Sequence, residues 1–187
     1  MAADRLQLAV IIGSVRAGRI GEAVSDWFGT QLDQHDEFSL DLIDLADLTL
    51  PDCLDGSGDA GVFAKRIDAA DGVVVITPEY NHGYPGALKT AIDSAREEWQ
   101  AKAVGFVSYG GVAGGLRAVE QLRLVFAELH TVTVRQVVSL HFVHDLFDGN
   151  GMLTDHHAPA AAHKMLAQLA WWSRALRSAR AEEAYDA

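Results

Sequence analysis

The sequence has little of several features, and each shortage excludes a class of protein. Only one of its 187 residues is a cysteine, Cys53, so an intrachain disulfide is excluded and a reducing compartment is expected. The chain has 15 lysine and arginine residues against 26 aspartate and glutamate residues, a formal charge of −11, which disfavours nucleic acid as a partner. No apolar run approaches the roughly 20 residues of a membrane span. The run at residues 8–12 is too short for a signal-peptide core, so we expect a cytoplasmic protein that does not bind membranes.

The composition that remains is typical of a folded globular protein. Hydrophobic residues make up 49% and charged residues 22% of the chain, which does not indicate disorder. The length fits one domain, and neither repeats nor a low-complexity linker divide it. We therefore expect a single domain over residues 1–187.

Short apolar runs alternate along the chain with longer helical periods. The apolar runs predict strands at residues 6–12, 38–43, 72–77, 103–108 and 132–138. The apolar residues spaced three and four apart predict helices at residues 18–32, 62–70, 87–95, 116–129 and 160–180. On the last of these, Trp172 continues the apolar face and is expected in the core. The alternation predicts an α/β domain with a parallel sheet and helices on both faces.

The first loop of functional interest follows the first predicted strand, at residues 13–21. Ligands of parallel sheets bind beyond the carboxyl ends of the strands, so such loops are candidate sites. This loop places Ser14, Arg16 and Arg19 at the start of a helix, where a hydroxyl, two guanidinium groups and free amides suit a phosphate. Because neither a P-loop nor Gly-x-Gly-x-x-Gly is present, the spacing favours one phosphate monoester over a pyrophosphate. The alternative is a surface turn with solvated arginines.

Two further loops follow the third and fourth predicted strands. Residues 77–86 combine two prolines, two tyrosines, Asn81 and His82, a rigid aromatic surface with exposed amides that suits a flat heteroaromatic ring. His82 also qualifies as a base or metal ligand, although a local hydrogen bond is the favoured interpretation. Residues 108–115 include four glycines, which allow a ligand to approach the backbone closely.

Three other kinds of site are disfavoured by spacing. The acidic residues around Gly149 lack the closing glutamate of a calcium-binding EF-hand loop, so a solvated turn is favoured there. The histidines from His141 to His163 are irregularly spaced, so no metal is expected. The Gly-x-Ser-x-Gly elbow of many serine hydrolases is absent.

In these loops the sequence resembles the NADPH-dependent FMN reductase family, flavodoxin-like proteins that include quinone, chromate and azo-dye reductases. The matching motifs lie at residues 13–19, at residues 78–89 with their Pro-Glu-Tyr-Asn block, and at residues 108–123. The likeness runs from about Leu6 to Val138. It implies a doubly wound five-stranded parallel sheet of strand order 2-1-3-4-5, with helices on both faces.

The resemblance also implies a chemistry. FMN would be the cofactor and NADPH or NADH the electron donor, with hydride passing through flavin N5 to a small-molecule electron acceptor such as a quinone. Because the cofactor carries the redox chemistry, no catalytic side chain is expected. The implied assembly is a homodimer or a dimer of dimers. Two alternatives stay open: a flavodoxin-like electron carrier or flavin-responsive binding protein without turnover of its own, and a domain for a different mononucleotide.

The family pattern carries over to particular residues of this chain. The FMN phosphate would bind Ser14, Arg16, Arg19 and the amides near Ile20 and Gly21. The isoalloxazine would lie against Pro78, Glu79, Tyr80, Asn81 and His82, with Ser108, Tyr109, Gly110 and Gly111 at its pyrimidine side. The acceptor pocket above the ring would have Tyr80, Tyr84 and Tyr109 as its walls. These assignments require that the first two loops lie close enough for one FMN to bridge them.

Overall fold

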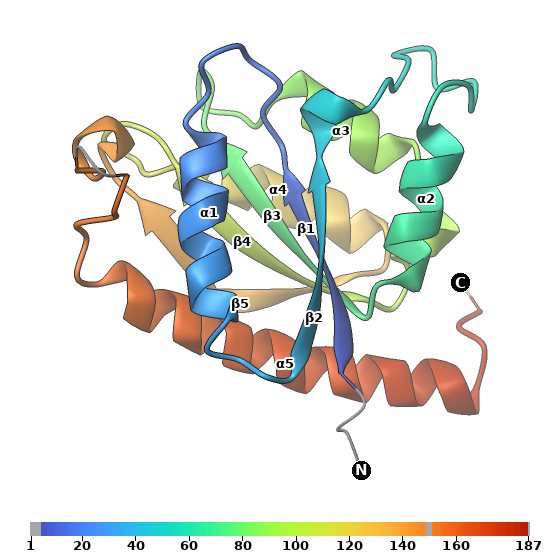
Figure 1. Cartoon of the computed structure of the whole chain (residues 1–187). Helices are drawn as coiled ribbons and strands as arrows, with labels where there is room; N and C mark the ends of the chain where they lie inside the picture. Colours follow the sequence, from blue (N-terminus) through green and yellow to red (C-terminus); the bar gives the residue numbers. More distant parts are fainter. Residues whose placement is uncertain (1–4, 149–150, 187) are drawn as a thin grey trace.

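The computed structural model describes residues 5–148 and 151–186, and within them five parallel strands form one sheet (Figure 1). The strands are β1 (Leu6–Ile12), β2 (Phe38–Asp44), β3 (Gly72–Pro78), β4 (Ala103–Tyr109) and β5 (Val132–Leu140). The helices that alternate with them are α1 (Gly21–Leu32), α2 (Ala60–Ala69), α3 (Gly86–Asp93), α4 (Leu116–Glu128) and α5 (Ala158–Glu182). Short 3-10 helices are η1 (Leu45–Asp47), η2 (Glu97–Trp99) and η3 (Val143–Asp145). The strand order is β2-β1-β3-β4-β5, and the predicted fold class is confirmed.

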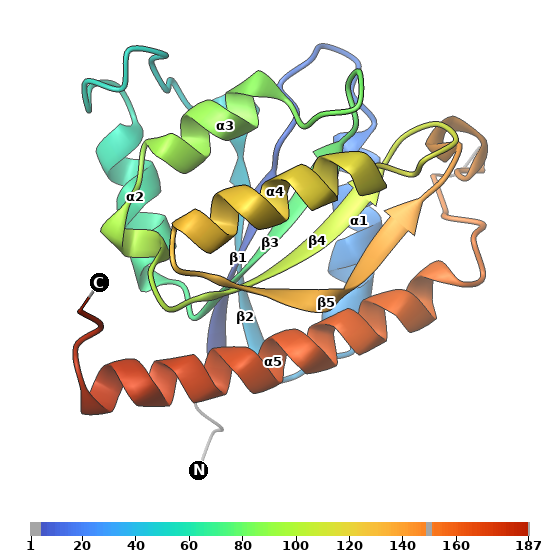
Figure 2. The ribbon, with the colours of Figure 1, turned by 180° about the vertical axis from the view of Figure 1, so that it is seen from behind.

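The sheet is the middle of three layers (Figures 1 and 2). Helices α1 and α5 pack on one face, and α2, α3 and α4 pack on the other. Strands β3 and β4 are buried at every position because both of their faces are covered, which explains their continuous apolar sequences. Strand β2 lies at one edge of the sheet, and only Phe38 and Ile43 of its seven residues are buried. The apolar core therefore lies in two slabs, one on each side of the sheet.

Element boundaries lie close to the predicted ones. Helix α1 begins at Gly21, three residues later than predicted, because Gly18 adopts a left-handed φ of 67° that a helix does not allow. Helix α5 extends two residues further at each end, and every other boundary lies within two residues of its prediction. The loop that precedes α1 is therefore long enough to curve around a ligand.

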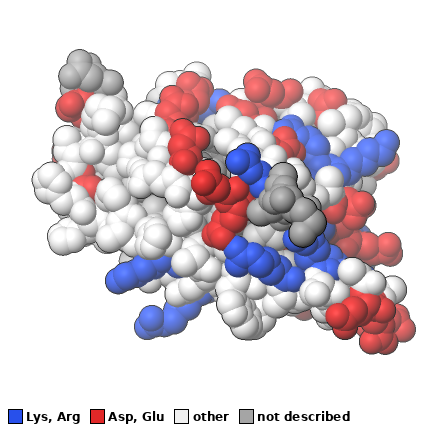
Figure 3. All heavy atoms as spheres, turned by 60° about the horizontal axis from the view of Figure 1, so that its bottom comes forward, with Lys and Arg blue, Asp and Glu red and all other residues white. Residues whose placement is uncertain are grey.

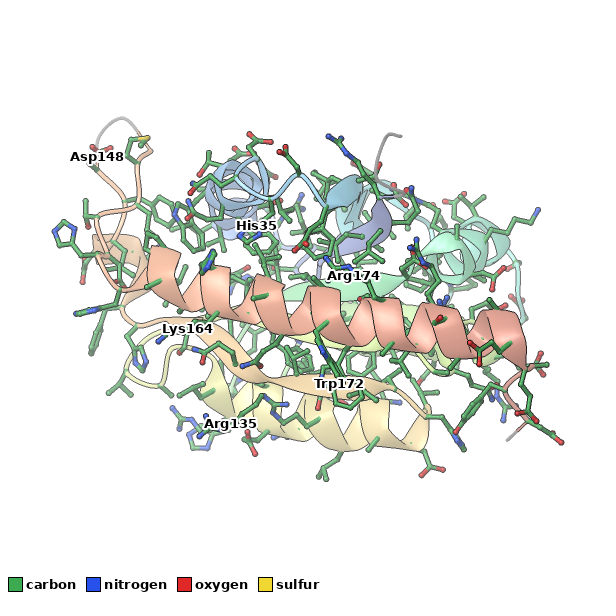
Figure 4. The ribbon with its side chains drawn as sticks, turned by 90° about the horizontal axis from the view of Figure 1, so that it is seen from below. His35, Arg135, Asp148, Lys164, Trp172 and Arg174 are labelled. Atoms are coloured by element: carbon green, nitrogen blue, oxygen red, sulfur yellow. The ribbon has the colours of Figure 1, made fainter. Side chains whose placement is uncertain are left out.

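The prediction that Trp172 lies in the core is wrong. Its exposed fraction is 37%, that of Trp171 is 61%, and the two rings pack edge to face with centroids 4.9 Å apart. The buried face of α5 instead includes Ser173, whose Oγ would lie 2.4 Å from a Cβ at Gly72. Only a small residue fits where α5 approaches β3 so closely. Trp172, which precedes Ser173 in the helix, therefore faces outward. Figure 4 labels Trp172 and Arg174 on opposite sides of α5. No helix of the described residues, α5 included, has the length and apolar character of a membrane span.

A network of charges joins α5 to the end of the sheet where the strands begin. Asp71, which is 8% exposed, lies 3.3 Å from Arg177 and 3.6 Å from Arg180. Figure 3 shows this side of the molecule, where basic and acidic groups lie beside one another. Lys102 is only 3% exposed and donates hydrogen bonds of 2.8 and 2.7 Å to the carbonyl oxygens of Asp68 and Ala70. Burial, with a smaller contribution from the nearby Arg180, lowers the pKa of Lys102 from 10.5 to about 8.

This lowered pKa predicts a stability that rises with pH. Between about pH 8 and 10.5 the unfolded chain keeps the Lys102 proton while the folded chain releases it, so raising the pH favours the folded state. From pH 7.5 to pH 9.5, we expect the free energy of unfolding of the natural chain to rise by about 1–2 kcal/mol more than that of Lys102→Met. Denaturant unfolding of both proteins at the two pH values measures the difference. Parallel pH profiles would contradict the lowered pKa.

Candidate functional site

A cavity of about 380 Å³ opens at the carboxyl edge of the sheet, where the loops after β1, β3, β4 and β5 meet. This volume falls within the range of roughly 300–1,000 Å³ that is usual for small-molecule sites. The lining residues are Arg16, Ala17, Gly18, Arg19, Ile20, Pro78, Glu79, Tyr80, Tyr109, Gly110, Gly111, Phe142, Val143, His144 and Asp145. The cavity thus lies where parallel α/β sheets bind their ligands.

The β1–α1 loop and the β3–α3 loop touch each other at this cavity. Ser14 is fully buried, and its Oγ lies 2.6 Å from the hydroxyl oxygen of Tyr80. The guanidinium carbon of Arg16 lies 5.3 Å from the centre of the Tyr80 ring, a cation–π distance. The two loops therefore have the proximity that a single bridging nucleotide requires.

The two arginines of the β1–α1 loop have different surroundings. The Arg19 side chain is only 11% exposed. Its Nη2 lies 2.5 Å from Oδ2 of Asp44 and 2.9 Å from Oε1 of Glu22. No carboxylate among residues 5–148 and 151–186 forms an ion pair with Arg16. Asp44 and Glu22 therefore neutralise Arg19, whereas Arg16 forms no ion pair with a described residue, in a wall that also includes Asp145.

A buried hydroxyl in the cavity wall forms no well-aligned hydrogen bond within the described part of the chain, although the Ser14 hydroxyl lies near it. Tyr109 is 4% exposed, and its hydroxyl lies beneath the start of α1, where a Cβ on Gly21 would come within 2.8 Å of it. Burial, and to a smaller extent Tyr80, raises the pKa of Tyr109 well above its ordinary value, against the opposing effects of Arg19 and Ser14. The hydroxyl is therefore a permanent donor. A donor without a well-aligned acceptor beside a helix N-terminus fits an anionic group such as the phosphate of FMN.

The β3–α3 loop begins with a tight two-residue turn. Tyr80 and Gly83 exchange backbone hydrogen bonds of 2.8 and 3.0 Å. Between them Asn81 and His82 both adopt left-handed backbone conformations, with φ of 50° and 70°. Such a turn favours Asn followed by Gly, and each non-glycine residue in this conformation costs about 1–2 kcal/mol. His82 therefore occupies a position where glycine would be the easier residue.

The β4–α4 loop brings its backbone, rather than its hydroxyl side chains, to the cavity. Gly110 and Gly111 line the wall. Ser108 is fully buried in β4, where its hydroxyl donates to the carbonyl oxygen of Gly114 at 2.8 Å. Gly115 has a φ of 84°, and a Cβ there would lie 2.7 Å from Ser108, so only glycine fits. Ser108 thus shapes this loop from behind.

The structure separates the predicted site residues into two groups. Those that line the cavity are Arg16, Arg19, Ile20, Pro78, Glu79, Tyr80, Tyr109, Gly110 and Gly111. The other predicted residues lie next to the cavity without lining it, and they are Ser14, Gly21, Asn81, His82 and Ser108. Tyr84, which was expected in the acceptor wall, is half-buried against the core slab under α2, α3 and α4 instead.

The sequence did not identify the segment that follows β5. Phe142, Val143, His144 and Asp145 line the cavity, and Phe142 is 56% exposed with a left-handed φ of 49°. The backbone N–H of Phe142 donates to Gly111 at 3.0 Å, which ties this segment to the β4–α4 loop. No motif marks it, but the rule that parallel strands present their carboxyl ends at one edge would have pointed to it.

No group of three or more histidine, cysteine, aspartate or glutamate side chains in the described part of the chain is arranged to hold a metal ion. Residues 149 and 150, at the centre of the predicted solvated turn, lie outside the described residues. Histidines His35 and His163 do meet, with ring centroids 5.1 Å apart, but they lie on the α5 side of the sheet.

Several known proteins are similar in sequence or structure to this chain. The family model described as NADPH-dependent FMN reductase matches residues 6–145. An NAD(P)H-dependent FMN reductase of Schizosaccharomyces pombe is 36% identical over 121 residues, which span 58% of this chain and 60% of the yeast protein. A 2-hydroxy-1,4-benzoquinone reductase of a Burkholderia species is 29% identical over 181 residues, which span 90% of this chain and 97% of that protein.

A solved structure with the same architecture is FerB, a flavoenzyme NAD(P)H:(acceptor) oxidoreductase of Paracoccus denitrificans. It superposes with a TM-score of 0.73 at 25% sequence identity, over 91% of this chain and 98% of FerB. The matched region of the family model holds all four loops that line the cavity. The chain belongs to the NADPH-dependent FMN reductase family, oxidoreductases with a flavodoxin-like fold that use FMN and NAD(P)H.

Proposed function

We propose that this chain is an FMN-dependent NAD(P)H oxidoreductase that passes hydride from a reduced nicotinamide, through flavin N5, to a small acceptor such as a quinone. The observation that carries the proposal is the contact between Ser14 and Tyr80, which joins the anion-binding loop to the aromatic loop in one cavity. The flavin, when bound, supplies the redox chemistry. The chain supplies position, charge and the exclusion of water.

The assignment of residues follows the cavity. Arg16 is the principal cation for the phosphate, with the amides of Ile20 and Gly21 at the start of α1. Ser14, Arg19 and the Tyr109 hydroxyl complete the phosphate side. Pro78, Glu79 and Tyr80 support the ring, with Asn81 and His82 as the turn behind it. The backbone of Gly110 and Gly111 faces the pyrimidine edge, and Ser108 shapes that loop.

The wider setting is also proposed. The two core slabs share one sheet, which supports a single domain over the chain. The acceptor is a small planar molecule, since Tyr80 and Phe142 give the cavity aromatic walls. The protein acts in the cytoplasm as a homodimer or a dimer of dimers. A single cysteine, which is exposed, supports the reducing compartment.

Anaerobic reduction by NADPH distinguishes an oxidoreductase from an electron carrier. We expect the FMN-loaded protein to lose its absorbance near about 450 nm within seconds of mixing with NADPH, and to regain it when a quinone is added. A flavin that stays oxidised would instead support the carrier or the flavin-responsive binding protein. A protein that takes up no FMN at all would support a different mononucleotide.

Arg16→Ala tests the phosphate site. Loss of one charge-assisted contact is expected to weaken FMN binding by about 1.5–3 kcal/mol. Riboflavin lacks the phosphate, so its affinity is expected to stay unchanged. Arg96→Ala, at an exposed arginine outside the cavity, is the control for loss of a positive charge. Titration of flavin fluorescence measures the affinities of the natural chain and of both variants for each flavin, and equal losses for FMN and riboflavin in Arg16→Ala would remove Arg16 from the phosphate site.

Tyr109→Phe separates stability from binding. Because the buried Tyr109 hydroxyl forms no well-aligned hydrogen bond with the described residues, its removal is expected to stabilise the FMN-free protein by about 1 kcal/mol. The same change is expected to weaken FMN binding about 3- to 10-fold and to leave riboflavin binding unchanged. Thermal unfolding and fluorescence titration give the two quantities. A destabilised FMN-free protein with full FMN affinity would show that the hydroxyl serves the fold.

A further inference from the structure

The turn from Glu79 to Gly83 has a shape that its own sequence does not favour. Its two central residues, Asn81 and His82, are both left-handed, and His82 stands where such a turn prefers glycine. Only the two backbone hydrogen bonds between Tyr80 and Gly83 hold the turn from within. Contacts from elsewhere in the fold are needed to keep a strained turn in one conformation.

Helix α4 supplies these contacts from its first two turns. The carboxylate of Glu79 is 8% exposed and accepts a hydrogen bond from the backbone N–H of Arg117 at 3.2 Å. The Arg117 Nε lies 2.7 Å from the same carboxylate, and Arg117 Nη1 contacts the ring nitrogen Nε2 of His82. One turn further along, Gln121 donates to the carbonyl oxygen of His82 at 2.7 Å. Arg117 thus contacts both Glu79, at the start of the turn, and His82, at its tip.

The turn that Arg117 and Gln121 contact also forms part of the cavity wall. Glu79 and Tyr80 line the cavity, whereas Arg117 and Gln121 do not. The Tyr80 ring, which Arg16 and Ser14 contact from the other loop, is fixed by the same turn. Loss of the contacts from Arg117 and Gln121 would therefore change the cavity wall through the conformation of the turn.

We propose that Arg117 and Gln121 are positioning residues, which hold the Glu79–Gly83 turn in the shape that supports the flavin ring. The expected effect on FMN affinity rests on the proposed function. The expected effect on the conformation of the turn does not. Neither residue touches the cavity. Their effect on FMN affinity is transmitted through the backbone of Tyr80 and His82, while Arg117 also neutralises the Glu79 carboxylate at the cavity wall.

The first experiment compares Arg117→Met with Arg123→Met. Arg123 also lies on α4, but its guanidinium binds the carbonyl oxygens of Val134 and Arg135 on β5, away from the turn. Arg117→Met is expected to weaken FMN binding at least 10-fold and to make the midpoint potential of bound FMN more negative, since the Glu79 carboxylate at the cavity then lacks its cation. Arg123→Met is expected to keep the FMN affinity and potential of the natural chain. Equal FMN affinities in the two variants would overturn the proposal.

A rescue experiment tests whether Arg117 acts through the turn. His82→Gly places the residue that a left-handed position favours, so the turn needs less support. We expect the double variant Arg117→Met/His82→Gly to bind FMN at least threefold more tightly than Arg117→Met, because glycine restores the turn that the lost contacts had held. A double variant as weak as Arg117→Met would overturn the positioning role, because the loss would then come from the missing charge itself.

Amide hydrogen exchange measures the turn without any flavin. In the FMN-free protein, Arg117→Met and Gln121→Leu are each expected to speed exchange at the amides of Tyr80 and Gly83 at least 10-fold, whereas Arg123→Met leaves them unchanged. Unchanged exchange in both Arg117→Met and Gln121→Leu would overturn the proposal even if FMN binds as proposed. Failure of the natural chain to bind FMN would refute the proposed function, while faster exchange would still support the role of Arg117 and Gln121 in holding the turn.

Discussion

The divergence of the chain after β1 and β3 is the constraint on which the cavity depends. These strands are neighbours in the sheet, yet the chain leaves β1 toward the face that α1 covers and leaves β3 toward the face that α3 covers. Two adjacent loops that turn in opposite directions leave a crevice between them. The hydrogen bond between Ser14 and Tyr80 crosses this crevice at its floor, so it fixes how far apart the two loops stand. Every other element of the site is arranged around that separation.

The fold tolerates several unfavourable local features around this crevice. Asn81, His82 and Phe142 are left-handed residues other than glycine, and all three lie at or beside the cavity. The Tyr109 hydroxyl adds a buried donor that forms no well-aligned hydrogen bond with the described residues. Such features persist only where the surroundings over-determine them. Here the surroundings are β3 and β4, which are buried at every position, and the α4 side chains that bind the turn. Leu54, Ala101, His130 and the Ser173 hydroxyl, which is also unpaired among the described residues, show similar features outside the cavity, so such features are not confined to it.

Much of this arrangement could be predicted from the sequence, because local patterns encode it. The buried run of β3 and the loops that follow β1, β3 and β4 needed no tertiary information, since apolar periodicity and turn residues mark them. The exposure of Trp172 could not be predicted, because it depends on how closely the neighbouring Ser173 packs against Gly72, 101 positions away by number. Phe142 was missed because no motif marks it. Its place in the wall comes from the parallel course of β5, which is a property of the whole sheet.

The pairing of charges shows the same limit and explains the electrostatics of the site. The sequence presents Arg16 and Arg19 as equivalent, but β2 ends at Asp44, and the pairing of β2 with β1 brings that carboxylate to Arg19 alone. Arg19 therefore braces the loop against the end of β2, and its charge is largely cancelled. Arg16 lies instead over the Tyr80 ring, and no carboxylate of residues 5–148 and 151–186 forms an ion pair with it. In a chain of net charge −11, Arg16 gives the loop before α1 a positive charge that suits one phosphate group, in a wall that also includes Asp145. A surface of net negative charge does not suit the backbone of a nucleic acid.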